Sequence, residues 1–264
     1  MTEPSAPIGV LDSGIGGFSV MAKLQELLPN EDIVYFGDNA HCPYGSRTGE
    51  DVTNLTQKIV DFLIEKGVKA IVIACNTIST QAKNLDNHGI PIIEIIGPVC
   101  RSFSIATPRS VGIVATPLTT RSKVYEMKLQ EENPSITPIG VAAPHLAALI
   151  EEGDFETTEI DDELKEAMQP LLENDVKYVI WGCTHYPLVA KKFRYLFPGI
   201  TFYDPAVFQA EELTNVLTSY RMPNLQEKHG SFTLYTSGPA QSATAAIERL
   251  KLPNPDKIVE NVLL

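Results

Sequence analysis

Residues 8–29 read IGVLDSGIGGFSVMAKLQELLP, and this order predicts a buried strand, a glycine turn and an amphipathic helix. The apolar residues 8–11 form the strand, residues 12–17 the turn, and residues 19–28 a helix that Pro29 ends. A strand that enters a helix through a short glycine turn is typical of α/β proteins, in which crossover helices join parallel strands.

The same alternation continues along the chain. Residues 33–36 (IVYF) predict a second strand, and residues 70–73 (AIVI) predict a third. Between them, residues 51–66 carry apolar side chains at the 3.6-residue period of a helix. We therefore expect an α/β fold with mostly parallel sheets and helices on both faces.

A weak internal repeat predicts a second half that is similar to the first. The stretch VGIVATP at 111–117 resembles IGVLDSG at 8–14, and YVIWGCTH at 178–185 resembles AIVIACNT at 70–77 at nearly the same offset. The pattern indicates two similar α/β domains related by a pseudo-twofold axis. We expect the active site in the cleft between them.

The repeat and the end of the chain together suggest domain boundaries. We expect a discontinuous first domain of residues 1–97 plus 210–264, and a second domain of residues 98–209. The last part of the chain predicts a strand at 232–235 and a helix at 240–250, which we assign to the first domain.

Composition excludes several classes of partner. The 264 residues include 33 acidic and 21 basic side chains, a net charge of −12, and no Lys/Arg cluster. We therefore expect neither nucleic acid nor a membrane as a partner. The first seven residues, MTEPSAP, lack the pattern of a leader, and no apolar run approaches the roughly 18 residues of a spanning helix. We expect a cytoplasmic protein.

The four cysteines, Cys42, Cys75, Cys100 and Cys183, show no CxxC spacing, so reduced thiols are expected. Cys75 and Cys183 each end an apolar strand and are followed by similar polar residues. Ligands of α/β proteins bind at the carboxyl ends of strands, so two such thiols can face one ligand from opposite sides. A single strand-end cysteine is commonly a buried small hydrophobe, but the matched pair favours two-base chemistry.

The motifs for common cofactors are broken or missing. GIGGFS at 14–19 has Ser19 where a dinucleotide fingerprint has its third glycine. The remaining helix start suits a carboxylate or a phosphate, and close packing of helix and strand is the alternative explanation of the glycines. Pyridoxal phosphate needs a lysine, and none occurs in the candidate segments 8–17, 36–45, 74–77 and 182–186. We expect no cofactor.

A metal site is the alternative use of the thiols. Cys183 and His185 lie on the same side of an extended chain and could bind a metal together with Cys75, Asp12 or the pair at 41–42. No second pair at zinc-ligand spacing accompanies them, so we expect no metal.

Four motifs, in the same order along the chain, resemble the bacterial glutamate racemase family. They are GVLDSGIGG at 9–17, YFGDNAHCPYG at 35–45, ACNT at 74–77 and GCTHYPL at 182–188. The resemblance extends from residue 8 to the TSGP turn at 236–239. It implies a cofactor-independent isomerase that interconverts L-glutamate and D-glutamate with two cysteines as acid and base. Such an enzyme supplies D-glutamate for peptidoglycan, the cell-wall polymer.

The resemblance also implies roles for individual residues. Cys75 and Cys183 match the two acid/base thiols, which act on D-glutamate and L-glutamate respectively. Asp12 matches the carboxylate beside the first thiol, and Glu151 and His185 match the groups beside the second. The positions that match substrate-binding residues are Asp12, Ser13, Tyr44, Gly45, Asn76, Thr77, Thr116, Thr119, Thr184 and His185.

Two positions depart from the family pattern. Gly97 precedes Pro98 where the family has Glu or Gln, and AAP at 142–144 replaces Ala-Cys-Pro before the assisting glutamate. The sequence therefore does not decide whether Glu151 or Glu152 assists Cys183, and a solvated helix end is the alternative for either.

The substrate has two carboxylates, yet the motifs contain no Arg or Lys, so hydroxyls, amides and backbone N–H groups would bind it. Alternatives are an aspartate racemase or a decarboxylase of the same superfamily, and a two-lobed solute-binding module. A decarboxylase can work with one cysteine and a binding module needs none. The sequence leaves open the depth of the pocket, regulation by cell-wall precursors, movement of the halves, and whether the protein is a homodimer.

Overall fold

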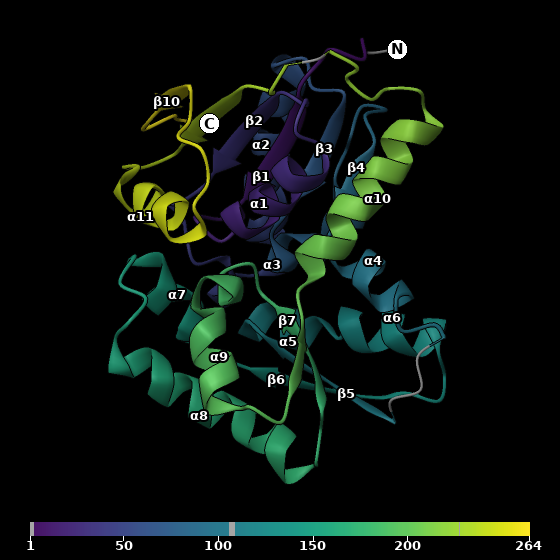
Figure 1. The fold of residues 1–264 in the computed structure, drawn as a ribbon, viewed down its shortest axis with the longest axis vertical. Coiled ribbons are helices and arrows are strands. Elements are labelled where there is room, and N and C mark those ends of the chain that lie inside the picture. The colour runs from purple at the N-terminus through teal and green to yellow at the C-terminus, as the bar shows by residue number, and fades with distance from the viewer. Residues whose placement is uncertain (1–2, 106–108, 227) are drawn as a thin grey trace.

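The computed structural model describes residues 3–105, 109–226 and 228–264. The amino-terminal stretch considered above begins with residues 1 and 2, which lie outside this range, as do 106–108 and 227. The described chain forms two sheets, both parallel, each flanked by helices and lying one above the other in Figure 1. The predicted α/β class with parallel sheets is confirmed.

The upper sheet in Figure 1 has six strands in the order β10-β9-β2-β1-β3-β4. Its strands are β1 (Ile8–Asp12), β2 (Ile33–Gly37), β3 (Ala70–Ile73), β4 (Ile92–Glu94), β9 (Phe232–Thr236) and β10 (Lys257–Val259). The carboxyl-terminal strand β9 pairs with β2, so the end of the chain returns to this sheet. We call this sheet and the helices packed on it the first lobe.

Both faces of the first sheet are buried. Val10 packs in one apolar cluster with α1 (Phe18–Leu27) and α10 (Pro205–Ser219), whereas its neighbour Leu11 packs in another with α2 (Gly49–Glu65). Successive side chains of a strand point to opposite faces, so a strand covered on both sides must be apolar throughout. This explains why the predicted strands are unbroken apolar runs.

The second lobe is built on a four-stranded sheet in the order β6-β5-β7-β8. Its strands are β5 (Ser110–Ala115), β6 (Thr137–Ala142), β7 (Tyr178–Gly182) and β8 (Thr201–Tyr203). Its helices are α5 (Pro117–Ser122), α6 (Val124–Glu132), α7 (Leu146–Glu151), α8 (Thr158–Glu173) and α9 (Ala190–Leu196). The remaining elements are α3 (Asn76–Ser79), α4 (Ile96–Arg101), α11 (Gln241–Leu250) and single 3₁₀ turns at Tyr44–Ser46, Ala82–Asn84 and Tyr186–Val189.

The chain crosses from the first sheet to the second through a helix. Residues 96–101 form α4, whose first N–H groups, those of Ile96 and Gly97, donate to the Glu94 carboxylate at 2.6 and 2.9 Å. A Cβ at Gly97 would lie 2.5 Å from Glu94 Oε1, so glycine leaves room for this cap. The chain returns through α10, which packs against both α1 and α4. The exact division into domains stays a prediction.

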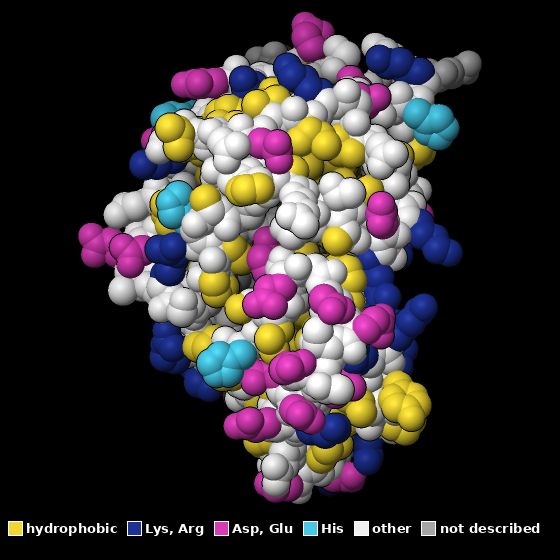
Figure 2. All heavy atoms as spheres, turned by 90° about the vertical axis from the view of Figure 1, so that its left-hand side faces the viewer, with side chains coloured by type: hydrophobic (Ala, Val, Ile, Leu, Met, Phe, Trp, Pro, Cys, Tyr) yellow, Lys and Arg dark blue, Asp and Glu magenta, His cyan; other side chains and the backbone are white. Residues whose placement is uncertain are grey.

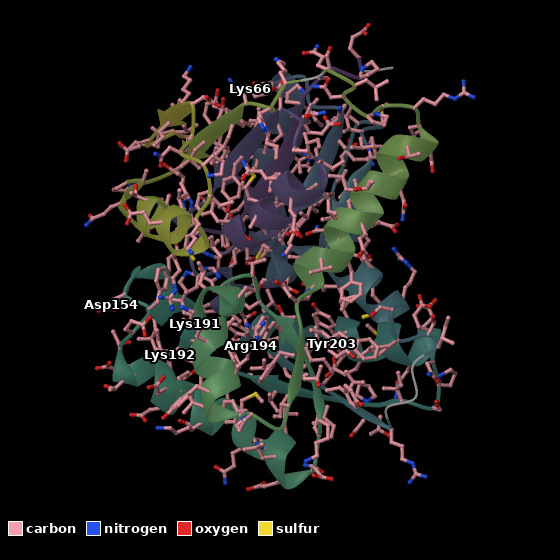
Figure 3. All side chains as sticks on the ribbon, viewed as in Figure 1. Lys66, Asp154, Lys191, Lys192, Arg194 and Tyr203 are labelled. Carbon is pink, nitrogen blue, oxygen red and sulfur yellow. The ribbon has the colours of Figure 1, made fainter. Side chains whose placement is uncertain are left out.

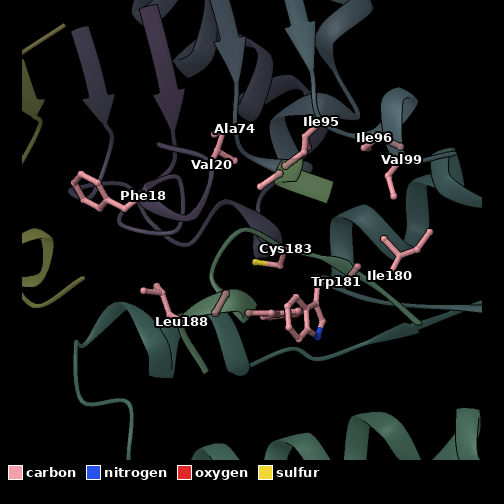
Figure 4. Packing of buried hydrophobic residues seen from close by; sticks show 14 of the residues in the cluster. Phe18, Val20, Ala74, Ile95, Ile96, Val99, Ile180, Trp181, Cys183 and Leu188 are labelled. Carbon is pink, nitrogen blue, oxygen red and sulfur yellow. The ribbon is translucent and has the colours of Figure 1, made fainter. Parts of the chain in front are cut away.

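The carboxyl ends of the strands in the two lobes meet at one boundary. In Figure 4 the strands of the first lobe point down toward this boundary, and Cys183 lies there at the end of β7 above the buried Trp181. This is the arrangement in which the loops of both sheets converge on one site.

The outer surface carries most of the charge. Acidic side chains gather on the lower half of the face in Figure 2, in keeping with the net charge of −12. Two of the basic side chains labelled on α9 in Figure 3, Lys192 and Arg194, have partners of their own. Lys192 Nζ lies 2.8 Å from Asp161 Oδ1, and the guanidinium of Arg194 stacks on Trp181. Within the described ranges, no helix combines the length and the apolar character that a membrane crossing requires.

Candidate active site

The structure brings the two strand-end thiols to one cavity from opposite lobes. Cys75 lies between β3 and α3, directly before the first residue of the helix, while Cys183 follows β7, and both are buried. Ser13 Oγ lies 3.6 Å from Cys75 Sγ, and His185 Nδ1 lies 3.5 Å from Cys183 Sγ. Each thiol therefore has a different polar neighbour.

Most of the predicted binding residues line this cavity together with the thiols. They are Ser13, Tyr44, Gly45, Asn76, Thr77, Thr116, Thr184 and His185. The cavity has a volume of only about 10 Å³, which is room for one water molecule and far too little for an amino acid. None of the described residues that line it is Arg or Lys. The other predicted residues, Asp12, Thr119 and Glu151, lie behind this lining and bond to it.

Asp12 defines the electrostatics of the Cys75 side. It is fully buried, and its carboxylate accepts hydrogen bonds from Gly14 N at 3.0 Å and from Thr184 Oγ1 at 3.1 Å. Burial raises the pKa of Asp12 to about 6, although the charge of His185 opposes the rise. Burial, followed by the nearby Asp12 carboxylate, raises the pKa of the Cys75 thiol to about 12. Cys75 is thus a thiol rather than a thiolate in this state.

The Cys183 side carries a histidine and a glutamate. His185 Nε2 lies 2.6 Å from Glu151 Oε2, which also accepts a hydrogen bond from Ile15 N at 3.1 Å. Burial alone would lower the pKa of His185, but its interactions with Cys183, Cys42 and Glu151 raise it well above the usual value. The other ring nitrogen, Nδ1, faces the Cys183 sulfur. Glu151, at the end of α7, makes the contact, while Glu152 is exposed.

The glycine turn after β1 faces the second lobe. A Cβ at Gly14 would lie 2.4 Å from Glu151 Oε2, and one at Gly16 would lie 2.4 Å from Thr184 Oγ1 and 2.5 Å from His185 Nδ1. Real Cβ atoms do not approach so closely, so these glycines allow the two lobes to touch. The close packing at Gly14 and Gly16 is between the lobes, whereas the alternative considered for this motif was packing of helix against strand.

Hydroxyl and amide groups supply the polar lining between the thiols. The Oγ1 atoms of Thr77, Thr116 and Thr119 form a triangle with sides of 2.9, 3.0 and 3.2 Å that joins the two lobes. Tyr125 OH donates to Asn76 Oδ1 at 2.5 Å. Asn76 Nδ2 is buried and has no hydrogen-bond partner within the described part of the chain, so it remains a donor for a ligand.

Tyr44 is held in place by an acidic neighbour. Its hydroxyl donates to the Asp38 carboxylate, whose other oxygen lies 2.8 Å from His41 Nδ1. Tyr44 and Gly45 begin a 3₁₀ turn that contacts α3 and α5, and thus bridges the two lobes. A Cβ at Gly45 would lie 2.5 Å from Thr116 Cβ.

Sequence reasoning missed two residues that contribute to the site. Cys42 was considered only as part of a metal site, yet it lines the cavity and lies against His185. Its position within the motif at 35–45 was the signal that could have found it. Tyr125 orients the amide of Asn76, but a tyrosine on a helix gives no sequence signal of such a contact.

Comparison with known proteins agrees with the geometry. A two-lobed α/β fold with thiols from both lobes at one polar cavity defines a class of enzymes with paired acid/base groups. The model of the Asp/Glu/Hydantoin racemase family matches residues 8–213, so the chain belongs to this family. The family resemblance seen in the sequence is confirmed.

Individual relatives match over most of their length. The glutamate racemase of Lactobacillus acidophilus is 40% identical over 243 residues, 89% of this chain and 90% of that protein. The glutamate racemase of Carboxydothermus hydrogenoformans is 34% identical over 92% of this chain and 91% of that protein. A solved structure of the Francisella tularensis glutamate racemase in complex with D-glutamate has a TM-score of 0.89 and 30% identity, with 97% of each chain covered. The Bacillus anthracis isoform RacE1 has a TM-score of 0.90 and 31% identity, with 98% of each chain covered.

Proposed function

We propose that this protein is a glutamate racemase that interconverts L-glutamate and D-glutamate, with Cys75 and Cys183 as acid and base and without a cofactor. The observation that carries the proposal is that the two thiols line one cavity from opposite lobes. Relatives named glutamate racemase, at 34–40% identity, support glutamate as the substrate.

Inversion at Cα needs a base on one face and an acid on the other. With L-glutamate bound, the Cys183 thiolate removes the α-proton and becomes a thiol. The Cys75 thiol then gives its proton to the opposite face and becomes a thiolate, so that D-glutamate is formed and the two cysteines have exchanged states. The reverse reaction starts from the Cys75 thiolate. Protons balance without any other reactant.

The surroundings of the two thiols differ. Burial and Asp12 raise the pKa of Cys75 to about 12, whereas Cys183 has the His185 ring beside it, with Nδ1 3.5 Å from the sulfur. In this proposal Asp12 assists proton transfer at Cys75, and the Glu151–His185 pair assists it at Cys183.

Neutral groups bind the two carboxylates of the substrate. Asn76 Nδ2 lacks a partner within the described residues, and the threonine triangle offers hydroxyls from both lobes. Ser13, Tyr44, Gly45 and Thr184 complete the lining. Hydrogen bonds aimed at the α-carboxylate also stabilise the charge that develops when Cα loses its proton. Because the cavity is too small for glutamate, the lobes separate before substrate enters.

The D-glutamate that the enzyme forms would be used in peptidoglycan synthesis. We place the enzyme in the cytoplasm. We propose a homodimer as its assembly. Light scattering of the purified protein gives the mass of the particle and so distinguishes a dimer from a monomer.

The test is exchange of the α-hydrogen of L-glutamate and D-glutamate with deuterated water, using the purified protein without added cofactor. We expect exchange and racemisation with the wild type. Cys75→Ala and Cys183→Ala should each abolish racemisation while the circular dichroism spectrum is unchanged. If either variant keeps near-wild-type turnover in both directions, the two-thiol mechanism is wrong. Exchange on aspartate but not on glutamate would overturn the choice of substrate.

A further inference from the structure

Cys42 lies in the cavity, yet the proposed reaction does not use it. It belongs to the loop between β2 and the 3₁₀ turn at Tyr44–Ser46, and it is partly buried. Its Sγ, one carboxylate oxygen of Glu151 and one ring nitrogen of His185 all lie within 4.8 Å of one another. A thiol, an imidazole and a carboxylate are the donors that Zn²⁺ binds in proteins.

The distances between the three ligand atoms and an unpaired carboxylate oxygen in this cluster fit a small cation. With metal–ligand distances of about 2.0–2.3 Å, tetrahedral zinc holds its ligand atoms roughly 3.3–3.8 Å apart, so shifts of about 1 Å complete the site. Glu151 Oε1 is buried and has no hydrogen-bond partner among the residues described, so its lone pairs are available to a metal. Two of the three residues, Cys42 and His185, also line the cavity of about 10 Å³, and Glu151 lies directly behind it.

The three ligands come from both lobes. Cys42 belongs to the first lobe, whereas Glu151 ends α7 and His185 follows β7 in the second. An ion bound to all three therefore ties the lobes together around a cavity that excludes glutamate. It also occupies the imidazole whose Nδ1 lies 3.5 Å from Cys183 Sγ.

We propose that Cys42, Glu151 and His185 form an inhibitory site for Zn²⁺ or a similar divalent cation, which holds the two lobes closed. The inhibition rests on the proposed racemase function, whereas the binding does not. Binding releases two protons to the solvent, one from the Cys42 thiol and one from the imidazolium of His185, and nothing is oxidised or reduced. The metal-free protein is the active form.

Two measurements test the site. In the first, racemisation is measured with increasing Zn²⁺ at several glutamate concentrations, for the wild type, Cys42→Ser and the matched control Cys100→Ala. Cys100 is buried in α4 and does not line the cavity. We expect inhibition that is competitive with glutamate and reversed by a chelator. Cys42→Ser should weaken the inhibition by zinc at least about tenfold, and Cys100→Ala should leave that inhibition unchanged.

The second measurement does not depend on activity. Co²⁺ bound by a thiolate absorbs in the near ultraviolet, so a titration with Co²⁺ reports binding through sulfur. We expect a saturable band in the wild type and in Cys100→Ala, and a loss of at least about tenfold in affinity in Cys42→Ser. Equal Co²⁺ affinity and equal Zn²⁺ inhibition in Cys42→Ser and the wild type would overturn the proposal, as would inhibition that is not competitive with glutamate. Binding that depends on Cys42 in a protein that lacks racemase activity would support the site and refute the proposed function.

Discussion

Replacing Asp12 by Asn should stabilise the folded protein at neutral pH while it impairs catalysis. Burial raises the pKa of Asp12 from 3.8 to about 6, so the folded state binds this proton more tightly than the unfolded state does. Above pH 6 the carboxyl is ionised in both states, and its burial then lowers the free energy of unfolding by roughly 3 kcal/mol. Asn at position 12 carries no charge and avoids this loss.

Because burial raises the pKa of Asp12, the destabilisation that it causes grows with increasing pH. Below about pH 4 Asp12 is protonated in both states and the loss is absent, and it develops as the pH rises from about 4 to 6. The free energy of unfolding of Asp12→Asn minus that of the wild type should therefore increase over this range by up to roughly 3 kcal/mol. The Thr184 hydroxyl, which donates to Asp12, has to reorient toward the new amide, and this reduces the gain at every pH alike.

Urea unfolding followed by circular dichroism at a series of pH values from 4 to 7 measures this difference. Asp32→Asn is the control, because hydrogen bonds from Ser231 lower the pKa of Asp32 even though its partial burial opposes this. That variant should be less stable than the wild type by an amount that is nearly constant above pH 5, since Asp32 is ionised in both states there. A difference for Asp12→Asn that does not change with pH would refute the argument that burial controls this carboxyl.

Three further predictions concern the reaction. With Cα-deuterated substrates, Asp12→Asn should raise the primary isotope effect for D-glutamate and His185→Asn for L-glutamate, since each removes the assistant of one thiol; identical changes for both enantiomers would contradict these roles. A chelator or hydroxylamine should leave the racemisation rate unchanged while a thiol-alkylating agent abolishes it, and activity lost on chelation but restored by zinc would show a required metal. Gly16→Ala should lower kcat/KM by about 100-fold, because its Cβ would lie 2.5 Å from His185 Nδ1 and displace the imidazole; Gly199→Ala, where a Cβ meets nothing within 4 Å, is the control that should behave as the wild type.

The buried strands were predictable because their apolar runs have one explanation in an α/β protein. Residues 8–11, 33–36 and 70–73 all lie within strands, and residues 232–235 lie in β9. The sequence did not predict β4 and β10, because strands of three residues are too short for a periodic pattern. Their pairing depends on neighbouring strands rather than on their own residues.

The site was predictable where a residue follows a strand and less so where contacts cross between lobes. Cys75 and Cys183 stand at strand ends, so topology alone brings them to one boundary. The choice between Glu151 and Glu152 depends on how α7 ends and on which side chain reaches His185. A single sequence does not contain this information. The contact of Tyr125 with Asn76 likewise joins residues from different lobes.

The threonine triangle has a consequence for how strongly the enzyme holds its ligands. Without substrate, the hydroxyls of Thr77, Thr116 and Thr119 already satisfy one another across the closed boundary. Glutamate therefore competes with the protein's own contacts, and its apparent dissociation constant rises in inverse proportion to the fraction of molecules that are open. If about one molecule in a hundred is open, affinity falls about 100-fold. Because closure without ligand lowers the open fraction in the same way for both enantiomers, it weakens the binding of L-glutamate and of D-glutamate by the same factor.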